Sequence, residues 1–254
     1  MNNKSTYREF LLIRSIAELK ADVRRSFLGV LWWFLEPVIY MTVFYVVFGL
    51  GLRQGDSGFV VFLLTGLIFW RWFDASVKQC SSSIVSFRGL IGQVYLPKVL
   101  LPMVPFLANS FRFLIVLTML AVVLVGSSMA SLETWWWSLP LIICQALLTL
   151  SIGFFLAALI PLIPDLKRFV DYGMTLLFFM SAIFYRIEHI DPEKYFYFMF
   201  NPMAFFIESQ RMVLIRGEQP DTQFLIAYGV LSLILMAMSV AVLKRFDKVY
   251  PKLV

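Results

Sequence analysis

The stretch Arg24–Gly51 reads RRSFLGVLWWFLEPVIYMTVFYVVFGLG, and it decides the fold. Two basic residues precede a long apolar run that only the Glu36-Pro37 pair interrupts. About 20 apolar residues cross the hydrocarbon core of a bilayer as a helix, because the backbone there must hydrogen-bond to itself. The basic pair predicts that the chain enters this helix from the cytoplasmic side.

The composition indicates a multi-pass membrane protein. Of 254 residues, 60% are hydrophobic and 17% aromatic, whereas soluble domains have about 45–50% apolar residues. The net charge of +6 comes from basic residues in loops beside apolar runs, which excludes nucleic acid as a partner. His189 is the only histidine, so no histidine metal cluster is expected. Cys80 and Cys144 lie in or near apolar runs and are expected to be buried free thiols.

The order of apolar runs predicts an all-α integral membrane protein, with one membrane domain over residues 1–254. The positive-inside rule places both termini in the cytoplasm, because Lys and Arg concentrate in the loops on that side. No cleavable signal peptide is expected, since the first 25 residues are charged throughout. Six spans are predicted, at residues 28–52, 59–80, 101–125, 135–160, 169–185 and 224–243.

Residues 7–25 are predicted to form an amphipathic helix rather than a span. Leu12, Ile16, Leu19 and Val23 recur at helical spacing, and charged residues cover the remaining faces. Such a helix lies in the interface of the cytoplasmic leaflet. Two interpretations stay open, a simple anchor and a platform that also contacts a partner.

The segment between the fifth and sixth predicted spans is too polar to cross the membrane and too apolar for a free loop. Asn201-Pro202 divides it, because proline cannot continue a helix. Two short re-entrant helices in the outer leaflet, within residues 192–214, are therefore expected. Its aromatic residues suit either an ordinary membrane interface or stacking against sugar rings. They are Tyr195, Phe196, Tyr197, Phe198, Phe200, Phe205 and Phe206.

Ionisable residues inside apolar segments usually face a bundle interior or a cavity, because charge is costly in lipid. Arg71, Asp74 and Lys78 are spaced three and four apart and share one helix face. They form either a local ion-pair ladder or the polar lining of a conduit. Glu36, Arg112 and Asp171 are further ionisable residues of this kind.

Catalytic motifs are missing from the sequence. No G-x-x-x-x-G-K-[ST] phosphate-binding loop occurs, so an ATPase that drives this protein would be a separate chain. A single histidine in an outer loop excludes a Ser-His-Asp set. The carboxylates Glu188, Asp191 and Glu193 have the spacing of a solvated turn.

Four segments in order resemble the membrane subunits of bacterial polysaccharide ABC exporters, which move O-antigen, capsule or teichoic-acid chains. The first is RRSFLGVLWWFLEPVIYMTVFYVVFG at Arg24–Gly49, which resembles the family's R-x-S-x-L-G-x-L-W-x-x-L-x-P signature. LIGQVYLPKVLLP at Leu90–Pro102 is similar to the family's inner loop before the third span. PDLKRFVDYGMTLLFFMSAIFY at Pro164–Tyr185 is similar to its fifth span, and NPMAFFIESQRMVLIRG at Asn201–Gly217 to its outer segment.

This resemblance implies the partners and the localisation. It implies a homodimeric permease in the bacterial cytoplasmic membrane, paired with two copies of a nucleotide-binding subunit that uses ATP and Mg. This chain itself would bind no cofactor and catalyse no reaction. The substrate would be a lipid-linked polysaccharide, conducted through a channel between the two subunits.

The resemblance also implies site residues. The helix at 7–25 would face the ATPase through Arg14, Glu18 and Lys20, and residues 83–94 would be a coupling helix. Leu90, Ile91, Val94 and Tyr95 are apolar and expected to be exposed to a partner. The residues that would couple to the ATPase are Arg88, Gly89, Leu90, Ile91, Gly92, Gln93, Val94 and Tyr95. Channel-lining candidates are Trp32, Glu36, Tyr40, Arg71, Asp74 and Lys78. An outer gate would contain Tyr195, Tyr197, Phe198, Asn201, Pro202, Phe205, Glu208 and Arg211, with Glu208 and Arg211 paired with each other or across the dimer.

Three other functions remain as alternatives. A permease of the same fold could carry a drug, a lipid, haem or another small substrate. A membrane-embedded transferase would need a carboxylate or histidine cluster at the interface, and the sequence has none. A passive channel would show no dependence on an ATPase.

Overall fold

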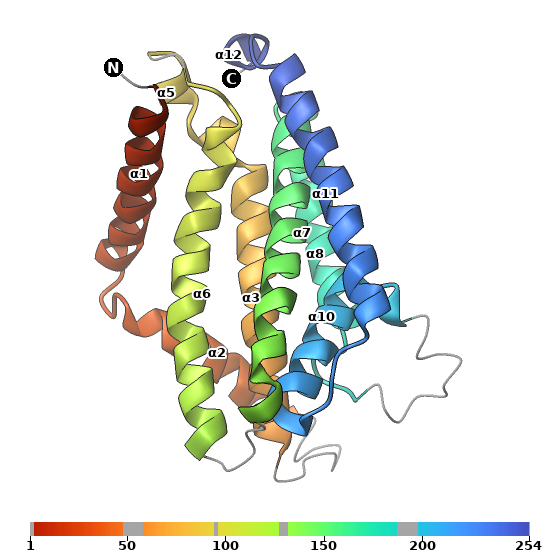
Figure 1. The fold of residues 1–254 in the computed structure, drawn as a ribbon. Coiled ribbons are helices and arrows are strands. Elements are labelled where there is room, and N and C mark those ends of the chain that lie inside the picture. Colours follow the sequence, from red (N-terminus) through yellow and green to blue (C-terminus); the bar gives the residue numbers. More distant parts are fainter. Residues whose placement is uncertain (1–2, 48–57, 94–95, 127–131, 187–197, 254) are drawn as a thin grey trace.

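The computed structural model describes residues 3–47, 58–93, 96–126, 132–186 and 198–253, and all regular elements in these ranges are helices (Figure 1). The predicted all-α class is therefore confirmed. Four helices are long and apolar enough to cross a membrane, and they match the second, third, fourth and sixth predicted spans. They are α3 (Phe59–Ser81), α6 (Leu100–Gly126), α7 (Ser138–Leu159) together with the preceding 3-10 turn η2 (Leu132–Trp137), and α11 (Thr222–Arg245).

The first predicted span begins later in the structure. Helix α2 (Leu31–Phe44) has 14 residues and the chain stays helical through Val47, while residues 48–52 of the prediction lie outside the described ranges. It begins later than predicted because the chain turns just before it, where Gly29 has a φ of 50° that L-residues with a side chain rarely adopt. The backbone N–H of Leu31 donates to the carbonyl of Leu28 and closes this turn.

The fifth predicted span, residues 169–185, is also displaced. Helix α8 (Leu166–Met180) begins three residues earlier than predicted and ends five residues earlier. Residues 181–185 form turns and bends instead, and Ala182 has a φ of 53°. The prediction was wrong here because apolar sequence alone does not show that the carbonyl groups of this segment bind a distant side chain.

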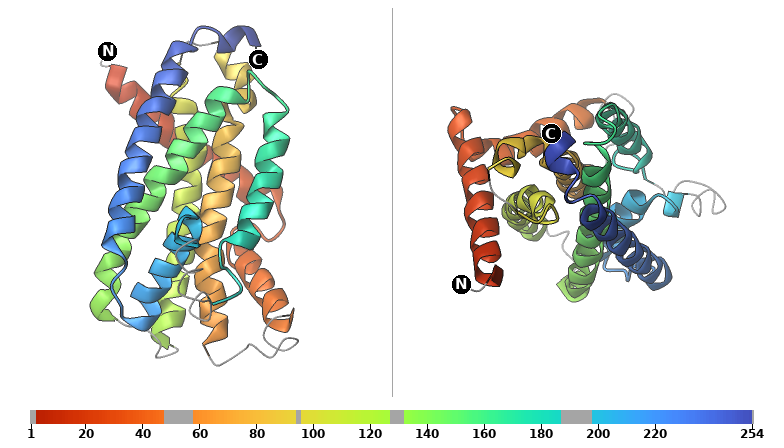
Figure 2. Two further views of the ribbon diagram at one scale, coloured as in Figure 1. Left: turned by 90° about the vertical axis from the view of Figure 1, so that its right-hand side faces the viewer. Right: turned by 90° about the horizontal axis from the view of Figure 1, so that it is seen from above.

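Helix α3 is the centre of the bundle. In its most apolar window, 83% of the residues are buried, compared with 17% for α11. It contacts α2, α6, α7, α8 and α10 (Pro202–Arg211), which surround it (Figure 2). The rings of Trp72 on α3 and Phe113 on α6 stack with centroids 4.2 Å apart. Most residues of α3 are therefore enclosed by the neighbouring helices, whereas Gln79 near its end is exposed.

Helices α7 and α11 pack along each other through serine hydroxyls. Ser151 donates to the carbonyl of Ser232 at 2.8 Å, and Ser239 donates to the carbonyl of Ser151 at 3.0 Å. Small polar residues allow close helix packing where water is absent. Cys144 on α7 is buried and Cys80 on α3 is buried, both as free thiols, as expected.

Helix α1 (Asn3–Arg25) lies beside α6 and is inclined to the bundle axis (Figures 1 and 2). The predicted helix is present, and two residues of its predicted apolar stripe are exposed. Leu12 and Ile16 are 60% and 49% exposed, whereas Ser15 is 6% exposed and donates to the carbonyl of Val104. The polar side of α1 thus faces the bundle, and an apolar side is left for lipid.

Both ends of the chain lie at one end of the bundle, together with α4 (Ser83–Ser86), α5 (Arg88–Ile91) and α12 (Tyr250–Leu253) (Figure 1). Ile91 is 7% exposed and packs in a cluster that includes Ile84, Leu101 and Phe154. The expectation that Ile91 is exposed to a partner was therefore wrong, because this side chain completes a core beneath the segment. Val94 and Tyr95 lie outside the described residues.

Helix α10 and the π-helical turn η4 (Met212–Arg216) lie in the half of the bundle away from the chain ends (Figure 1). Asn201 caps α10, because its side-chain oxygen accepts from the backbone N–H of Met203 at 3.0 Å. The predicted break at Asn201-Pro202 is confirmed. Residues 192–197, with Tyr195 and Tyr197, lie outside the described ranges, while Phe198 and Met199 are helical.

Candidate functional site

A ladder of charged side chains follows one face of α3 in the middle of the bundle. Lys78 Nζ lies 2.6 Å from Asp74 Oδ1, and Arg71 Nη1 lies 4.0 Å from Asp74 Oδ2. Arg71 also pairs with Glu36 on α2. Four of the six channel-lining candidates are thus joined into one network between α2 and α3.

The ladder borders two cavities. One has a volume of about 250 Å³, lies between α2, α3 and α8, and is lined by Tyr40, Arg71, Asp74, Lys78 and Phe178 among others. The other has about 170 Å³ and lies between α2, α3 and α6, with Glu36, Arg71, Gln79, Asn109 and Arg112 in its wall. Arg71 belongs to both and separates them. The charged residues of α3 therefore fit both interpretations of the sequence. They form a local ion-pair ladder, and they border open space as the lining of a conduit would.

The two aromatic candidates on α2 differ in their surroundings. The guanidinium of Arg71 lies over the ring of Tyr40, 5.7 Å from its centroid. Tyr40 is 40% exposed and completes the wall of the larger cavity. Trp32 is 43% exposed and lines neither of the two cavities described above.

A separate ion pair, between Asp22 and Arg112, joins α1 to α6. Asp22 of α1 accepts from the Arg112 guanidinium of α6. Arg112 Nη1 donates to Asn109 Oδ1 at 3.0 Å, and Asn109 Nδ2 donates to Gln79 Oε1 at 3.0 Å. Asp22, Asn109 and Gln79 were not among the residues selected from the sequence. Of these four residues, only Arg112 was noted in the sequence, as a single cation inside an apolar run.

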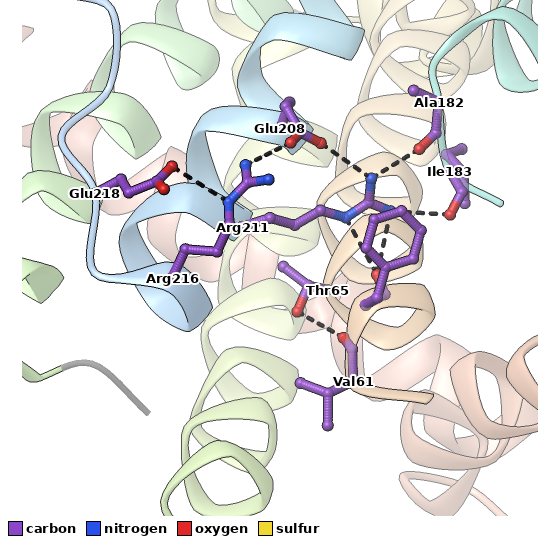
Figure 3. Close-up of polar contacts among 9 residues, drawn as sticks. Val61, Thr65, Ala182, Ile183, Glu208, Arg211, Arg216 and Glu218 are labelled. Atoms are coloured by element: carbon purple, nitrogen blue, oxygen red, sulfur yellow. Dashed lines mark hydrogen bonds and ion pairs between the residues drawn. The ribbon is translucent and has the colours of Figure 1, made fainter. Parts of the chain in front are cut away.

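Arg211 is an enclosed charge in the half of the bundle away from the chain ends, and its side chain is 2% exposed (Figure 3). Its Nη1 donates to the carbonyl of Ala182 at 2.8 Å, and its Nη2 donates to the carbonyl of Ile183 at 2.9 Å. Both Nε and Nη2 donate to the carbonyl of Phe62 on α3. One guanidinium thus joins α10, α3 and the segment after α8, which explains why α8 ends at Met180.

Glu208 balances this buried charge. Its carboxylate lies 3.4 Å from Arg211 Nη1 and 2.5 Å from Arg216 Nη2, and its own side chain is 3% exposed (Figure 3). Burial lowers the pKa of Arg211 to about 10, and the Glu208 charge opposes that effect. Arg211 therefore remains charged at neutral pH. Of the two open possibilities, Glu208 and Arg211 pair with each other within the chain.

At the end of the bundle away from the chain ends, η4 and α10 contact the start of the α7 span. Thr134 donates to the carbonyl of Val213 at 2.6 Å, and Trp135 Nε1 donates to the carbonyl of Leu214. Ser138 donates to Gln210 Oε1 at 2.9 Å. Phe205 is buried against Phe206 and Tyr228, so it does not offer its ring to a ligand, whereas Phe200 is 61% exposed.

The end of the bundle that carries both chain ends has a groove of about 310 Å³. Its walls include Val85, Ser86 and Arg88 from the α4–α5 segment and Pro164 and Lys167 before and at the start of α8. Arg88, Gly89, Gly92 and Gln93 are exposed, and Leu90 is half-buried.

Helix α1 meets this end of the bundle through Arg14, whose guanidinium lies over the Phe87 ring, 5.2 Å from its centroid. Lys20 is exposed. Glu18 is half-buried on the α6 side, and burial raises its pKa although the nearby Arg112 and Arg14 charges oppose this. Of the three residues expected to face the ATPase, Arg14 and Lys20 remain available at the surface.

Four described helices that are long and apolar enough to cross a membrane are typical of a polytopic membrane protein. The family profile of the ABC-2 type transporters matches residues 11–215, and the chain belongs to that family. It is 32% identical to an O-antigen export system permease protein, RfbA, of Myxococcus xanthus over 91% of this chain and 89% of that protein.

Two further relatives are more distant. An O-antigen export system permease protein RfbA of Klebsiella pneumoniae is 29% identical over 82% of this chain and 81% of that protein. The polysialic acid transport protein KpsM of Escherichia coli is 21% identical over 80% of each. The chain is thus an ABC-2 permease homologous to O-antigen and polysialic acid export permeases, and the family implies a multi-pass inner-membrane protein with an ATPase partner.

Proposed function

We propose that this protein is the membrane subunit of an ATP-driven exporter of a lipid-linked polysaccharide. The family membership supports the function as a transporter, and the names of the relatives support a polysaccharide as the substrate. Two copies of the chain would form the channel, and two copies of a separate nucleotide-binding subunit would use ATP and Mg. Six crossings with both termini in the cytoplasm remain part of this proposal.

The charged network between α2, α3 and α8 is the single structural observation that supports a polar conduit best. Arg71, Asp74 and Lys78 border a cavity of about 250 Å³ between α2, α3 and α8, and the other residues that line it are mostly apolar. Exposed apolar side chains on both flanking helices, such as Val43 on α2 and Leu176 on α8, would contact the second subunit. A channel between subunits would then be polar along α3 and sealed from lipid at its edges.

The groove with Arg88 and Lys167 supports the position of the ATPase. It combines exposed basic groups with apolar Val85 and Pro164, and Arg14 of α1 lies against the same segment. A partner that offers acidic and apolar groups would fit this surface. ATP binding would favour one arrangement of the dimer over the other, and this difference would open or close the conduit.

The outer segment would act as a gate. Helix α10 and η4, held by Arg211 against α3, would re-enter the outer leaflet with the residues that precede Asn201. The Glu208–Arg211 pair would keep the gate in place rather than act as a latch between subunits, because Arg211 already binds three backbone carbonyls.

Reconstitution into proteoliposomes tests this function. The purified chain alone should hydrolyse no ATP, and addition of the nucleotide-binding subunit should give ATP-dependent movement of a lipid-linked polysaccharide. Movement without ATPase would instead show a passive channel. Transport restricted to small amphiphilic compounds would favour the alternative permease function, and ATP hydrolysis by the chain alone would contradict the proposal.

A further inference from the structure

The polar side of α1 is connected to α3 through two other side chains. Asp22 on α1 binds Arg112 on α6, Arg112 binds Asn109, and Asn109 binds Gln79 on α3. These contacts lead from an amphipathic helix to an exposed position near the end of α3. The apolar residues Leu12, Ile13 and Ile16 lie on the exposed side of α1.

The chain segment after α1 makes a second connection to α3. The turn with Gly29, whose φ is 50°, joins α1 to α2, and Glu36 of α2 pairs with Arg71 of α3. Arg112 also lies over the ring of Trp33 on α2, 5.8 Å from its centroid. Ion pairs on both sides of one turn therefore hold α1 to α6 and α2 to α3.

The carboxylates in this region outnumber the guanidinium groups, which argues against a site for an anionic ligand. Arg71 faces Glu36, and Arg112 faces Asp22 and the nearby Glu18. An anion in the cavity of about 170 Å³ would add a further negative charge that no free cation balances in the part of this region that the structure describes. Arg112 Nε has no hydrogen-bond partner among the described residues, so the guanidinium depends on Asp22 and Asn109 for its position.

We propose that Arg112 is a positioning residue that transmits the position of α1 to α3. This inference rests on the proposed function, in which α1 lies against the ATPase. A movement of α1 carries Asp22 with it, and Arg112 must follow because a guanidinium in an apolar bundle is unstable without its carboxylate. The amides of Asn109 and Gln79 then reorient, and α3 carries this change to the Arg71–Asp74–Lys78 ladder.

The test uses the complete transporter, reconstituted with its ATPase and its polysaccharide substrate, and measures export per ATP hydrolysed. Asp22→Asn and Arg112→Gln should each assemble normally and lower this ratio about tenfold, within the range of known coupling effects. The double variant should be no worse than either single variant, because both remove the same contact. Arg112→Lys should recover part of the ratio, since it keeps the charge for Asp22 and loses the fork that also reaches Asn109.

Glu9→Gln is the matched control, because it removes an exposed carboxylate from the same helix. Additive effects in the double variant, or an unchanged ratio in the single variants, would overturn the inference. Loss of assembly with a normal ratio in the remaining complexes would assign the contact to folding alone and overturn it as well. A wild-type complex that exports no polysaccharide would contradict the proposed function instead, so the two failures are distinguishable.

Discussion

Gly66 leaves the space that the Arg211 guanidinium occupies. A Cβ atom at residue 66 would lie 2.5 Å from Arg211 Nη2, closer than such atoms approach one another. Arg211 in turn binds carbonyls of Phe62, Ala182 and Ile183. Because Gly66 carries only a hydrogen atom as its side chain, the Arg211 guanidinium can lie against α3 and join α10 to the end of α8.

Gly66→Ala is expected to destabilise the protein by about 1–3 kcal/mol, because the added methyl group overpacks the site and displaces the guanidinium. Gly173→Ala on α8 is the control, since nothing lies within 4 Å of the corresponding Cβ and alanine favours a helix by up to about 1 kcal/mol. Thermal unfolding in detergent measures both. Equal stability of the two variants would show that the close approach carries no cost.

Arg211→Lys is expected to destabilise the protein by about 2–4 kcal/mol. A lysine keeps the charge near Glu208 but cannot bind three separated carbonyls with one ammonium group. The same measurement applies, with Arg245→Lys as a control because Arg245 is exposed at the end of α11. If Arg211→Lys unfolds at the wild-type temperature, the carbonyl contacts contribute little and charge alone holds the outer segment.

Ile91→Asp and Arg88→Glu should fail in different ways. Ile91 is buried, so an aspartate there places an unpaired charge in a core and should cost at least about 3 kcal/mol. Arg88 is exposed in the groove, so Arg88→Glu should leave stability unchanged and weaken binding to an ATPase by like-charge repulsion. Detergent stability and copurification with the ATPase separate the two effects. An Arg88→Glu variant that copurifies normally would place the partner elsewhere.

The orientation of the chain can be tested with single cysteines at exposed positions. In a background in which both buried cysteines are replaced by alanine, Gln219→Cys should react with an impermeant thiol reagent added from outside. Lys248→Cys should react only from the cytoplasmic side. Arg216 is not used for this labelling, because Glu208 holds its side chain. Labelling of both positions from one side would contradict the six-crossing topology.

The sequence by itself determined the class of protein and most of its helices. Hydrophobic runs of about 20 residues require helices in lipid, so the spans at α3, α6, α7 and α11 were predictable to within a few residues. The Asn201-Pro202 break was predictable for a local reason as well, because proline starts a helix that an asparagine side chain caps. The ladder of Arg71, Asp74 and Lys78 followed from helical spacing alone.

Only the tertiary structure decided which charges meet across helices. Asp22 and Arg112 are 90 residues apart, and no periodicity relates them. The early end of α8 depends on Arg211, which lies far along the chain and takes the carbonyls that a longer helix would have used internally. The burial of Ile91 was decided in the same way, since residues from α6 and α7 complete its core. A local pattern shows which face of a helix is apolar, whereas the partner of a buried polar group is set by packing.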